Sequence, residues 1–259
     1  MKIIILTSSR WGTAAHHLPY LLQIKSCEVA MVIFSRGKIS DKGKHYFKKF
    51  KKILSVGILG AINGIRMRKW YNENTAKYAG TVDLKDTCEQ SKIPFFEVET
   101  INSEKTISLF KQANADVGIS MDNGYIGKKI FSVPKFGMLN IHHEILPEYQ
   151  NAQSVIWQLY NNSSFTGYTI HKIDRQIDTG EILFQEKIPI IFKNTLADTV
   201  AHTSAVLLKS SAKGLLYVME HFEQLQKNAK PQNEEKKYFT PNIFQFLKIY
   251  RNYRKLRNS

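Results

Sequence analysis

The chain has few cysteines and no long apolar run. Its 259 residues include only Cys27 and Cys88, which excludes a disulfide framework and a cysteine-based metal cluster and fits a reducing compartment. The apolar stretch near the N-terminus, Ile3 to Leu6, is shorter than the roughly 7–15 residues of a secretory signal. The longest mostly apolar run, Ile53 to Ile65, contains glycines and is shorter than the roughly 20 residues of a spanning helix. We therefore predict a cytoplasmic protein.

Acidic residues are scarce relative to basic ones. The 37 basic and 22 acidic side chains give a formal net charge of +15. Residues 36–77 hold 12 basic and 2 acidic side chains, residues 227–259 hold 9 and 2, and the remaining chain is close to neutral with 16 and 18. The two basic segments indicate either an anionic partner, such as nucleic acid, a membrane surface or a phosphorylated substrate, or a solvated lysine-rich surface.

Short β-branched runs alternate with helical patterns in the first half of the chain. We expect strands at 2–7, 28–34, 94–98, 116–121 and 138–141, and helices at 13–24, 82–90 and 103–112 and between 42 and 70. This alternation predicts an α/β fold, a mostly parallel sheet with helices on both faces, and a ligand site at the carboxyl ends of the strands.

The second half of the chain has a different pattern. Strands are expected at 166–173 and 181–189, and helices at 153–160 and 195–226, the latter weakened at Gly214. Pro231 and its polar neighbours mark a boundary. We expect one domain over residues 1–226, with a basic helical insert at about 36–80, and a basic, aromatic, helical C-terminal segment at 227–259.

The loop after the first expected strand lacks both phosphate-binding fingerprints, G-x-G-x-x-G and G-x-x-x-x-G-K-[ST]. Ser8, Ser9 and Arg10 would suit a phosphate or ribose at a strand-to-helix turn, and they would equally suit a solvated turn. Trp11 is equally typical of base stacking and of packing. Metal binding is not predicted, because the histidines do not repeat a tetrahedral spacing. Those histidines are His16, His17 and His171.

Residues able to catalyse acyl transfer occur between positions 136 and 185. Asn140 and His142 alternate on one expected strand, so their side chains leave the same face. An amide donor can stabilise an oxyanion, and a nearby carboxylate, Asp174 or Asp178, would orient the imidazole. No serine or cysteine is placed as a nucleophile, which favours direct transfer to a substrate amine. Taken alone, an Asn-x-His pair is more often structural.

At these residues the sequence resembles the folate-dependent formyltransferases. The matching motifs are Asn140-Ile141-His142, Leu146-Pro147 and Asp178-Thr179-Gly180, with Gly167 to His171 on the strand before the aspartate loop. The resemblance is specific from Asp116 to Gln185. It implies a Rossmann-like fold and an enzyme that transfers a formyl group from N10-formyltetrahydrofolate, by direct attack through a tetrahedral intermediate and without a metal.

Departures from the family pattern narrow the choice of molecule that would accept the formyl group. His143-Glu144 stands where the family has Pro-Ser, and Gln150-Asn151 stands where the tRNA and purine enzymes have an Arg-Gly or similar pair. The purine enzyme's glycine-rich phosphate loop and the C-terminal β-barrel of the tRNA enzyme are both absent from this sequence. The resemblance is therefore greatest to sugar N-formyltransferases, which act on nucleotide-linked amino sugars such as O-antigen precursors. Methionyl-tRNA formyltransferase, a formyltetrahydrofolate hydrolase and a basic nucleic-acid or membrane binding module on an inactive fold stay as alternatives.

The resemblance also implies a role for each site residue. Catalysis falls to Asn140, His142 and Asp178. The folate would lie against Asn123, Gly124, Tyr125, Ile126, Ile173 and Asp174. The nucleotide-diphosphate amino sugar would contact Ser9, Arg10, Trp11, Glu144 and Gln150. No nucleic-acid partner is expected. Proximity to a membrane and pairing with a second copy both stay open.

Overall fold

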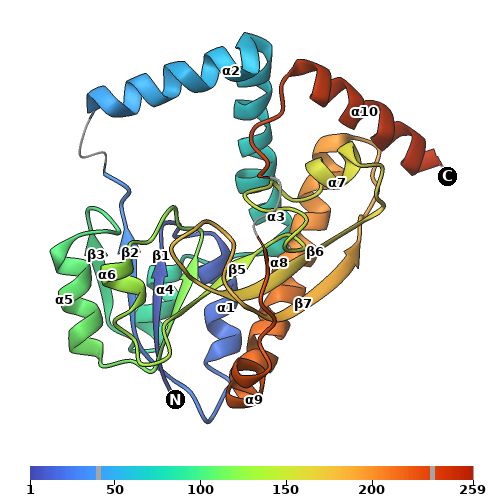
Figure 1. The fold of residues 1–259 in the computed structure, drawn as a ribbon. Helices are drawn as coiled ribbons and strands as arrows, with labels where there is room; N and C mark the ends of the chain where they lie inside the picture. The colour runs from blue at the N-terminus through green and yellow to red at the C-terminus, as the bar shows by residue number, and fades with distance from the viewer. Residues whose placement is uncertain (39–41, 234–236, 259) are drawn as a thin grey trace.

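The computed structural model describes residues 1–38, 42–233 and 237–258. Its centre is one seven-stranded sheet with the strand order β3-β2-β1-β4-β5-β6-β7 (Figure 1). The strands are β1 (Lys2–Thr7), β2 (Glu28–Ser35), β3 (Phe95–Val98), β4 (Val117–Met121), β5 (Met138–His142), β6 (Phe165–Lys172) and β7 (Ile182–Pro189). Strands β1 to β5 pair in parallel, whereas β6 and β7 add antiparallel pairs at one edge. The predicted mostly parallel α/β sheet is confirmed.

The apolar strand runs fill two hydrophobic layers. Successive side chains of a strand point to opposite faces. Ile3 and Ile5 therefore pack in the layer beneath α1 (Thr13–Leu21), α4 (Leu84–Gln90) and α8 (Leu196–Glu220). Ile4 and Leu6 pack in the opposite layer with α5 (Glu104–Ala113) and α6 (Lys128–Phe131). Helices thus cover both faces, as the sequence predicts, and the carboxyl ends of the central strands form one edge (Figure 1).

Three predicted helices have different bounds. Helix α1 ends at Leu21 rather than at residue 24, with Pro19 in its last turn. Helix α7 is only Ile156–Tyr160, because the preceding residues form a loop. The predicted 195–226 helix begins behind its Thr195 cap and is divided at His221 into α8 and α9 (Phe222–Lys227).

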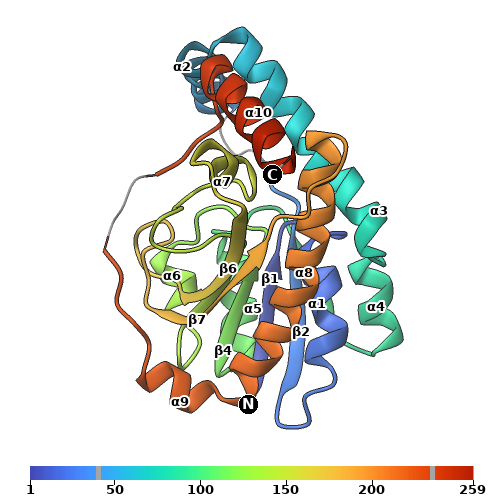
Figure 2. The same cartoon turned by 90° about the vertical axis from the view of Figure 1, so that its right-hand side faces the viewer.

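The basic insert and the C-terminal segment pack against each other. The insert contains α2 (Lys42–Lys69), the π-helix η1 (Trp70–Asn74) and α3 (Thr75–Ala79), and the segment contains α10 (Ile243–Asn258). Met67 and Trp70 share a hydrophobic cluster with Leu159 of α7 and Tyr253 of α10 (Figure 2). Helix α2 bends at Gly57, whose φ of 74° and ψ of 165° lie outside helical geometry and in a region that almost only glycine adopts.

Gly214 lies inside α8 where the helix crosses β6. A Cβ atom at this position would collide with the hydroxyl group of Tyr168, which donates a 2.6 Å hydrogen bond to Glu186. Tyr168 is fully buried. Gly214 therefore permits a close helix–sheet contact, and α8 continues through this glycine without a break.

We expect Gly214→Val to lower the free energy of unfolding by about 1–3 kcal/mol, because the added atoms overpack the contact with Tyr168. Urea unfolding followed by circular dichroism measures the change. Lys213→Val is the control, since its exposed neighbouring position carries only the propensity cost of valine. Equal losses in the two variants would contradict the packing role.

Candidate active site

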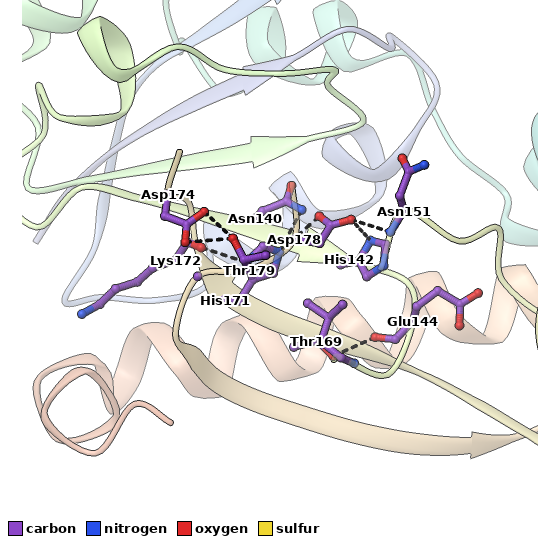
Figure 3. A network of polar contacts seen from close by, with 12 residues as sticks. Asn140, His142, Glu144, Asn151, Thr169, His171, Lys172, Asp174, Asp178 and Thr179 are labelled. Carbon is purple, nitrogen blue, oxygen red and sulfur yellow. Dashed lines mark hydrogen bonds and ion pairs between the residues drawn. The ribbon is translucent and has the colours of Figure 1, made fainter. Parts of the chain in front are cut away.

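Two polar side chains project from the end of β5 beside the first antiparallel strand. Asn140 lies opposite His171 and His142 opposite Thr169 in the β5–β6 ladder. Asn140 and His142 are two residues apart and leave the same face of the strand. The pairing thus brings His171, which ends the matching strand motif and has no role predicted from the sequence, beside the predicted pair (Figure 3).

Asp178 lies between the two histidines. Its Oδ2 is 3.7 Å from His142 Nδ1, and its Oδ1 is 3.7 Å from His171 Nε2. The backbone N–H of Asn151 donates a 2.9 Å hydrogen bond to Oδ2 (Figure 3). The side chains of His142 and Asp178 are only 13% and 12% exposed, so water screens their interaction weakly. The structure therefore brings the three predicted catalytic residues together.

His171 orients the Asn140 amide. Its Nδ1 donates to the carbonyl oxygen of Lys172 at 2.8 Å, which leaves Nε2 to accept from Asn140 Nδ2 at 3.2 Å. Burial lowers the pKa of His171 to about 4, so the ring is neutral at pH 7 and keeps this acceptor. One N–H of the amide is thereby fixed, and the other is left for a group in the cavity that Asn140 lines.

His142 holds one proton against the backbone. Its Nε2 lies 3.0 Å from the carbonyl oxygen of Tyr149, which can only accept, so Nε2 carries the hydrogen. The turn from Ile145 to Tyr149 places that carbonyl. The other nitrogen, Nδ1, carries no hydrogen in the neutral ring and faces Asp178 Oδ2 at 3.7 Å.

A cavity of about 480 Å³ opens beside these side chains. Its wall includes every residue predicted to contact the folate: Asn123, Gly124, Tyr125, Ile126, Ile173 and Asp174. The Asn123 amide donates to Leu6 O at 2.6 Å and accepts from Ser8 Oγ at 2.8 Å, so this side chain fixes its own loop. The contact of these residues with a folate stays a prediction.

A second cavity, of about 700 Å³, adjoins the first and shares part of its wall. The shared residues are Asp122, His143, Gln153 and Ser154. Ser9 and Trp11 line one side, and Arg68 and Tyr71 from the insert line another. Among the described residues, the buried Gln153 Oε1 has no hydrogen-bond partner. No motif in the sequence identifies Gln153 or the cavity residues of the insert as part of a site.

Three predicted acceptor contacts do not lie on either cavity. Arg10 instead pairs with Asp83, at 2.6 Å between Nη2 and Oδ2. Glu144 is 1% exposed and accepts a hydrogen bond from Gln158, and its burial raises its pKa well above the ordinary value. Gln150 is fully buried and donates to Asn233 O at 3.1 Å. These three side chains are therefore held by other protein groups and line neither cavity, and their contact with an acceptor stays a prediction.

The turn before α1 already holds an anionic group. Asp122 accepts from the backbone N–H of Thr13 at 2.6 Å and from its hydroxyl group at 2.7 Å. The carboxylate thus occupies the N-terminal end of α1, where a phosphate would otherwise bind. A phosphate bound at that position would face Asp122, so Arg68 across the second cavity is better placed to meet an anion.

Several residues around the cavities have positive φ angles. Asp122, Asn151, Val155 and Asp178 have φ values of 58°, 55°, 70° and 58°. Such angles are costly for non-glycine residues, above all for a β-branched valine. Asn151 and Asp178 also share the hydrogen bond that seats the carboxylate. The strained backbone is typical of a site whose geometry is under functional constraint.

The chain matches one family by sequence and a wider group by fold. The sequence model of the family described as Formyl transferase matches residues 61–209. Methionyl-tRNA formyltransferase of Thermodesulfovibrio yellowstonii is 31% identical over 160 residues, which are 60% of this chain and 50% of that protein. Methionyl-tRNA formyltransferase of Thermotoga sp. strain RQ2 is 35% identical over 108 residues, 41% of this chain and 34% of that protein. The chain thus spans half or less of the length of these curated relatives.

Solved structures share the fold over most of the chain. Glycinamide ribonucleotide transformylase 1 of Symbiobacterium toebii has a TM-score of 0.58 at 12% identity, over 90% of this chain and 94% of that one. An N-formyltransferase of Helicobacter canadensis has a TM-score of 0.54 at 17% identity, over 98% of this chain and 80% of that one. The predicted resemblance is confirmed.

His143 is the side chain whose burial has the clearest pH consequence. Its Nε2 and that of His17 lie 3.1 and 3.0 Å from Ser211 Oγ, whose own proton goes to Leu208 O. Burial, with smaller contributions from His142 and His16, lowers the pKa of His143 to about 4. The unfolded chain therefore binds more protons than the folded chain between about pH 6.5 and pH 4, and stability falls as the pH falls through this range.

We expect His143→Gln to lose less stability than the wild type between pH 7 and pH 4.5, by an amount on the order of 2 kcal/mol. Glutamine retains a donor for Ser211 but does not titrate. Urea unfolding at each pH measures the difference. His221→Gln, at an exposed position, should follow the wild type. Parallel pH profiles for the wild type and His143→Gln would contradict the assignment.

Proposed function

The chain belongs to the formyl transferase family, and from this premise we propose that it transfers a formyl group from N10-formyltetrahydrofolate to the amine of a nucleotide-linked amino sugar. The observation that supports this proposal most strongly is the pair of adjoining cavities beside Asn140, His142 and Asp178. A transfer between two bound molecules needs two sites that meet where the reacting atoms lie. The first cavity suits the donor, and the second suits the acceptor.

The first cavity has the character that a folate requires. Ile126, Ile141 and Ile173 give it apolar walls for a flat ring, and polar groups from the 174–178 loop border the same space. The loop keeps its shape because Asp174 accepts hydrogen bonds from Gln176 N at 3.0 Å and from Thr179 Oγ1 at 2.8 Å. The bound donor would supply an activated formyl carbonyl group at the open end, beside Asn140.

The side chains at the junction supply hydrogen bonds and proton transfer. The free N–H of Asn140 would stabilise the negative charge that develops on the formyl oxygen, and His142, neutral at first, would add a positive charge beside it once it has taken the proton of the acceptor amine. As the acceptor amine attacks, it loses a proton, which His142 Nδ1 receives and Asp178 holds in place until it passes to the leaving nitrogen. Gln153 lies on both cavity walls, and its buried Oε1, which has no hydrogen-bond partner among the described residues, keeps its capacity to accept a hydrogen bond from the acceptor.

The second cavity favours a small anionic acceptor. A volume of about 700 Å³ is within the range of small-molecule sites. Trp11 is 56% exposed on its rim and offers a ring for a nucleobase, and Arg68 offers a cation for a diphosphate. The Helicobacter canadensis enzyme, whose structure is a complex with folinic acid and dTDP-3-aminofucose, supports this choice by its likeness to 98% of the chain. The sequence relatives support methionyl-tRNA as the second candidate acceptor.

We expect Asn140→Ala, His142→Ala and Asp178→Ala each to lower the formyl transfer rate by about 10²–10³, because each removes a group that acts on the developing charge or the moving proton. Formation of tetrahydrofolate, with N10-formyltetrahydrofolate and a panel of nucleotide-linked 3-amino and 4-amino sugars, measures the rate. His221→Ala is the control. Retention of more than about a tenth of the rate by His142→Ala would remove His142 from the mechanism.

The same assay, with charged methionyl-tRNA added to the panel of sugars, decides between the two candidate acceptors. Transfer to charged methionyl-tRNA, with none to any nucleotide-linked amino sugar, would overturn the proposed acceptor and leave the formyl transfer chemistry intact. Tetrahydrofolate formation without any acceptor would identify a hydrolase instead.

We expect Arg68→Ala to raise the Michaelis constant for the nucleotide-linked sugar about tenfold and to leave that for the folate unchanged, since Arg68 lines only the second cavity. Arg66→Ala is a matched control on the same helix, because Arg66 lies on neither cavity wall and contacts Asn63 at 3.5 Å. Equal Michaelis constants for Arg68→Ala and Arg66→Ala would show that Arg68 does not bind the acceptor.

A further inference from the structure

The first half of α2 extends from the body of the molecule as a separate helix. We call residues 42–56 the arm. Figure 1 shows the arm reaching beyond the sheet and meeting the second half of α2 at a sharp bend, which lies at Gly57. The second half packs against the C-terminal segment, where a Cβ atom added at Gly60 would lie only 3.2 Å from Pro241 O and Asn242 Cα. At 1.5 Å per residue, the arm is about 22 Å long.

The arm presents a broad apolar stripe to solvent. Along a helix, residues three and four positions apart share one face. The exposed apolar side chains follow this spacing, and they are 43–68% exposed: Tyr46, Phe47, Phe50, Ile53 and Leu54. Exposed apolar surface of this extent on one element is typical of an interaction site.

Basic residues accompany the stripe, and acidic residues are absent. Between Lys42 and Lys69 the sequence holds nine lysines and arginines and no aspartate or glutamate. The exposed side chains of Lys49 and Lys51 border the stripe, and Lys51 Nζ lies 4.7 Å from the centre of the Phe47 ring. The arm therefore combines aromatic and aliphatic groups with unbalanced positive charge.

None of the helices in the described part of the chain has the length and apolar character that crossing a bilayer requires. An amphipathic helix with aromatic residues on one face and lysines beside it instead lies in the plane of a membrane interface. We propose that the arm binds the surface of an anionic lipid bilayer. Phe47, Phe50 and Leu54 enter the acyl boundary, and Lys49 and Lys51 meet the headgroup phosphates.

Charge complementarity favours lipid over the other occupants. Two arms packed together would bring the exposed Lys49 and Lys51 of each copy into proximity, and the sequence of the arm holds no acidic residue to pair with them. Nucleic acid would satisfy the lysines, but its phosphate backbone offers no partner for the exposed phenylalanines and leucine. An anionic bilayer satisfies both, because it presents phosphates above an apolar layer.

Helix α10 lies beside α2 at the same end of the molecule (Figure 2). It exposes Phe244 and Leu247, and its exposed Arg251 and Arg254 add positive charge. A bilayer that binds the arm would therefore also meet α10, which is likewise basic and exposes apolar side chains. This second contact would strengthen the binding.

Sedimentation with vesicles of phosphatidylcholine and phosphatidylglycerol, in a ratio of about two to one, tests the proposal. The protein should sediment with these vesicles and remain in solution with vesicles of phosphatidylcholine alone, and binding should weaken as salt is added. The variant Phe47→Ser/Phe50→Ser/Leu54→Ser and the variant Lys49→Glu/Lys51→Glu should each bind at least about tenfold more weakly.

Matched controls lie at the opposite edge of the sheet, in the loops that lead into β2 and β3. Leu22→Ser matches the loss of an exposed apolar group, and Lys25→Glu/Lys92→Glu matches the change in net charge. Both controls should bind as the wild type does. Equal thermal midpoints for all variants would exclude unfolding as the cause of any lost binding.

Three outcomes would overturn the proposal. The first is absence of the wild type from the anionic vesicle pellet. The second is equal weakening by the arm variants and the controls. The third is another occupant of the arm. Light scattering would identify a second copy if the wild type is a dimer and the apolar triple variant is a monomer. Competition would identify RNA if RNA displaces the wild type from the vesicles, if this displacement depends on Lys49 and Lys51, and if the triple variant still binds the vesicles. None of these results depends on whether the acceptor is a nucleotide-linked sugar.

Discussion

The pairing of β5 with β6 is the interaction on which the site depends. β5 is the last parallel strand and β6 the first antiparallel one, so the carboxyl end of β5 lies beside the middle of a strand that runs the other way. This register places His171 opposite Asn140 and starts the loop that returns with Asp178. A slip of one residue would move Asn140 and His142 to the other face of the sheet. The backbone hydrogen bonds between β5 and β6 thus determine which side chains face one another at the site.

The sequence allowed the fold and the three central side chains to be predicted because both depend on local periodicity. Alternation within 138–142 puts Asn140 and His142 on one face whatever their surroundings, and the motif resemblance identifies Asp178. The role of His171 depends on which residue lies opposite it, and the role of Asp122 depends on a turn more than a hundred residues away at Thr13. Neither the pairing of His171 with Asn140 nor the contact of Asp122 with Thr13 can be predicted from a local sequence pattern.

The burial of two predicted acceptor contacts has a physical cause. Glu144 and Gln150 are polar residues near a catalytic motif, which makes exposure the natural expectation. Gln158 of α7 covers the Glu144 carboxyl group, and the polypeptide before α10 covers Gln150. The insert was predicted as basic and helical, with an anionic partner as one reading of its charge, and the end of α2 and η1 supply Arg68 and Tyr71 to a cavity wall. The net charge of residues 36–77 sets the insert apart from the rest of the chain, but it does not show which end of the insert faces the cavity.

The backbone after Lys237 crosses the loop that seats the catalytic carboxylate. Tyr238 N donates to Gln150 O at 3.0 Å, Tyr238 O accepts from Asn151 Nδ2 at 2.8 Å, and Phe239 O accepts from the Trp157 indole at 3.1 Å. The backbone N–H of Asn151 in turn holds Asp178. During synthesis, Asn140, His142 and Asp178 leave the ribosome well before the stretch that holds their loop. A nascent chain would therefore carry all three side chains and still lack these hydrogen bonds to the loop until residues 237–239 emerge.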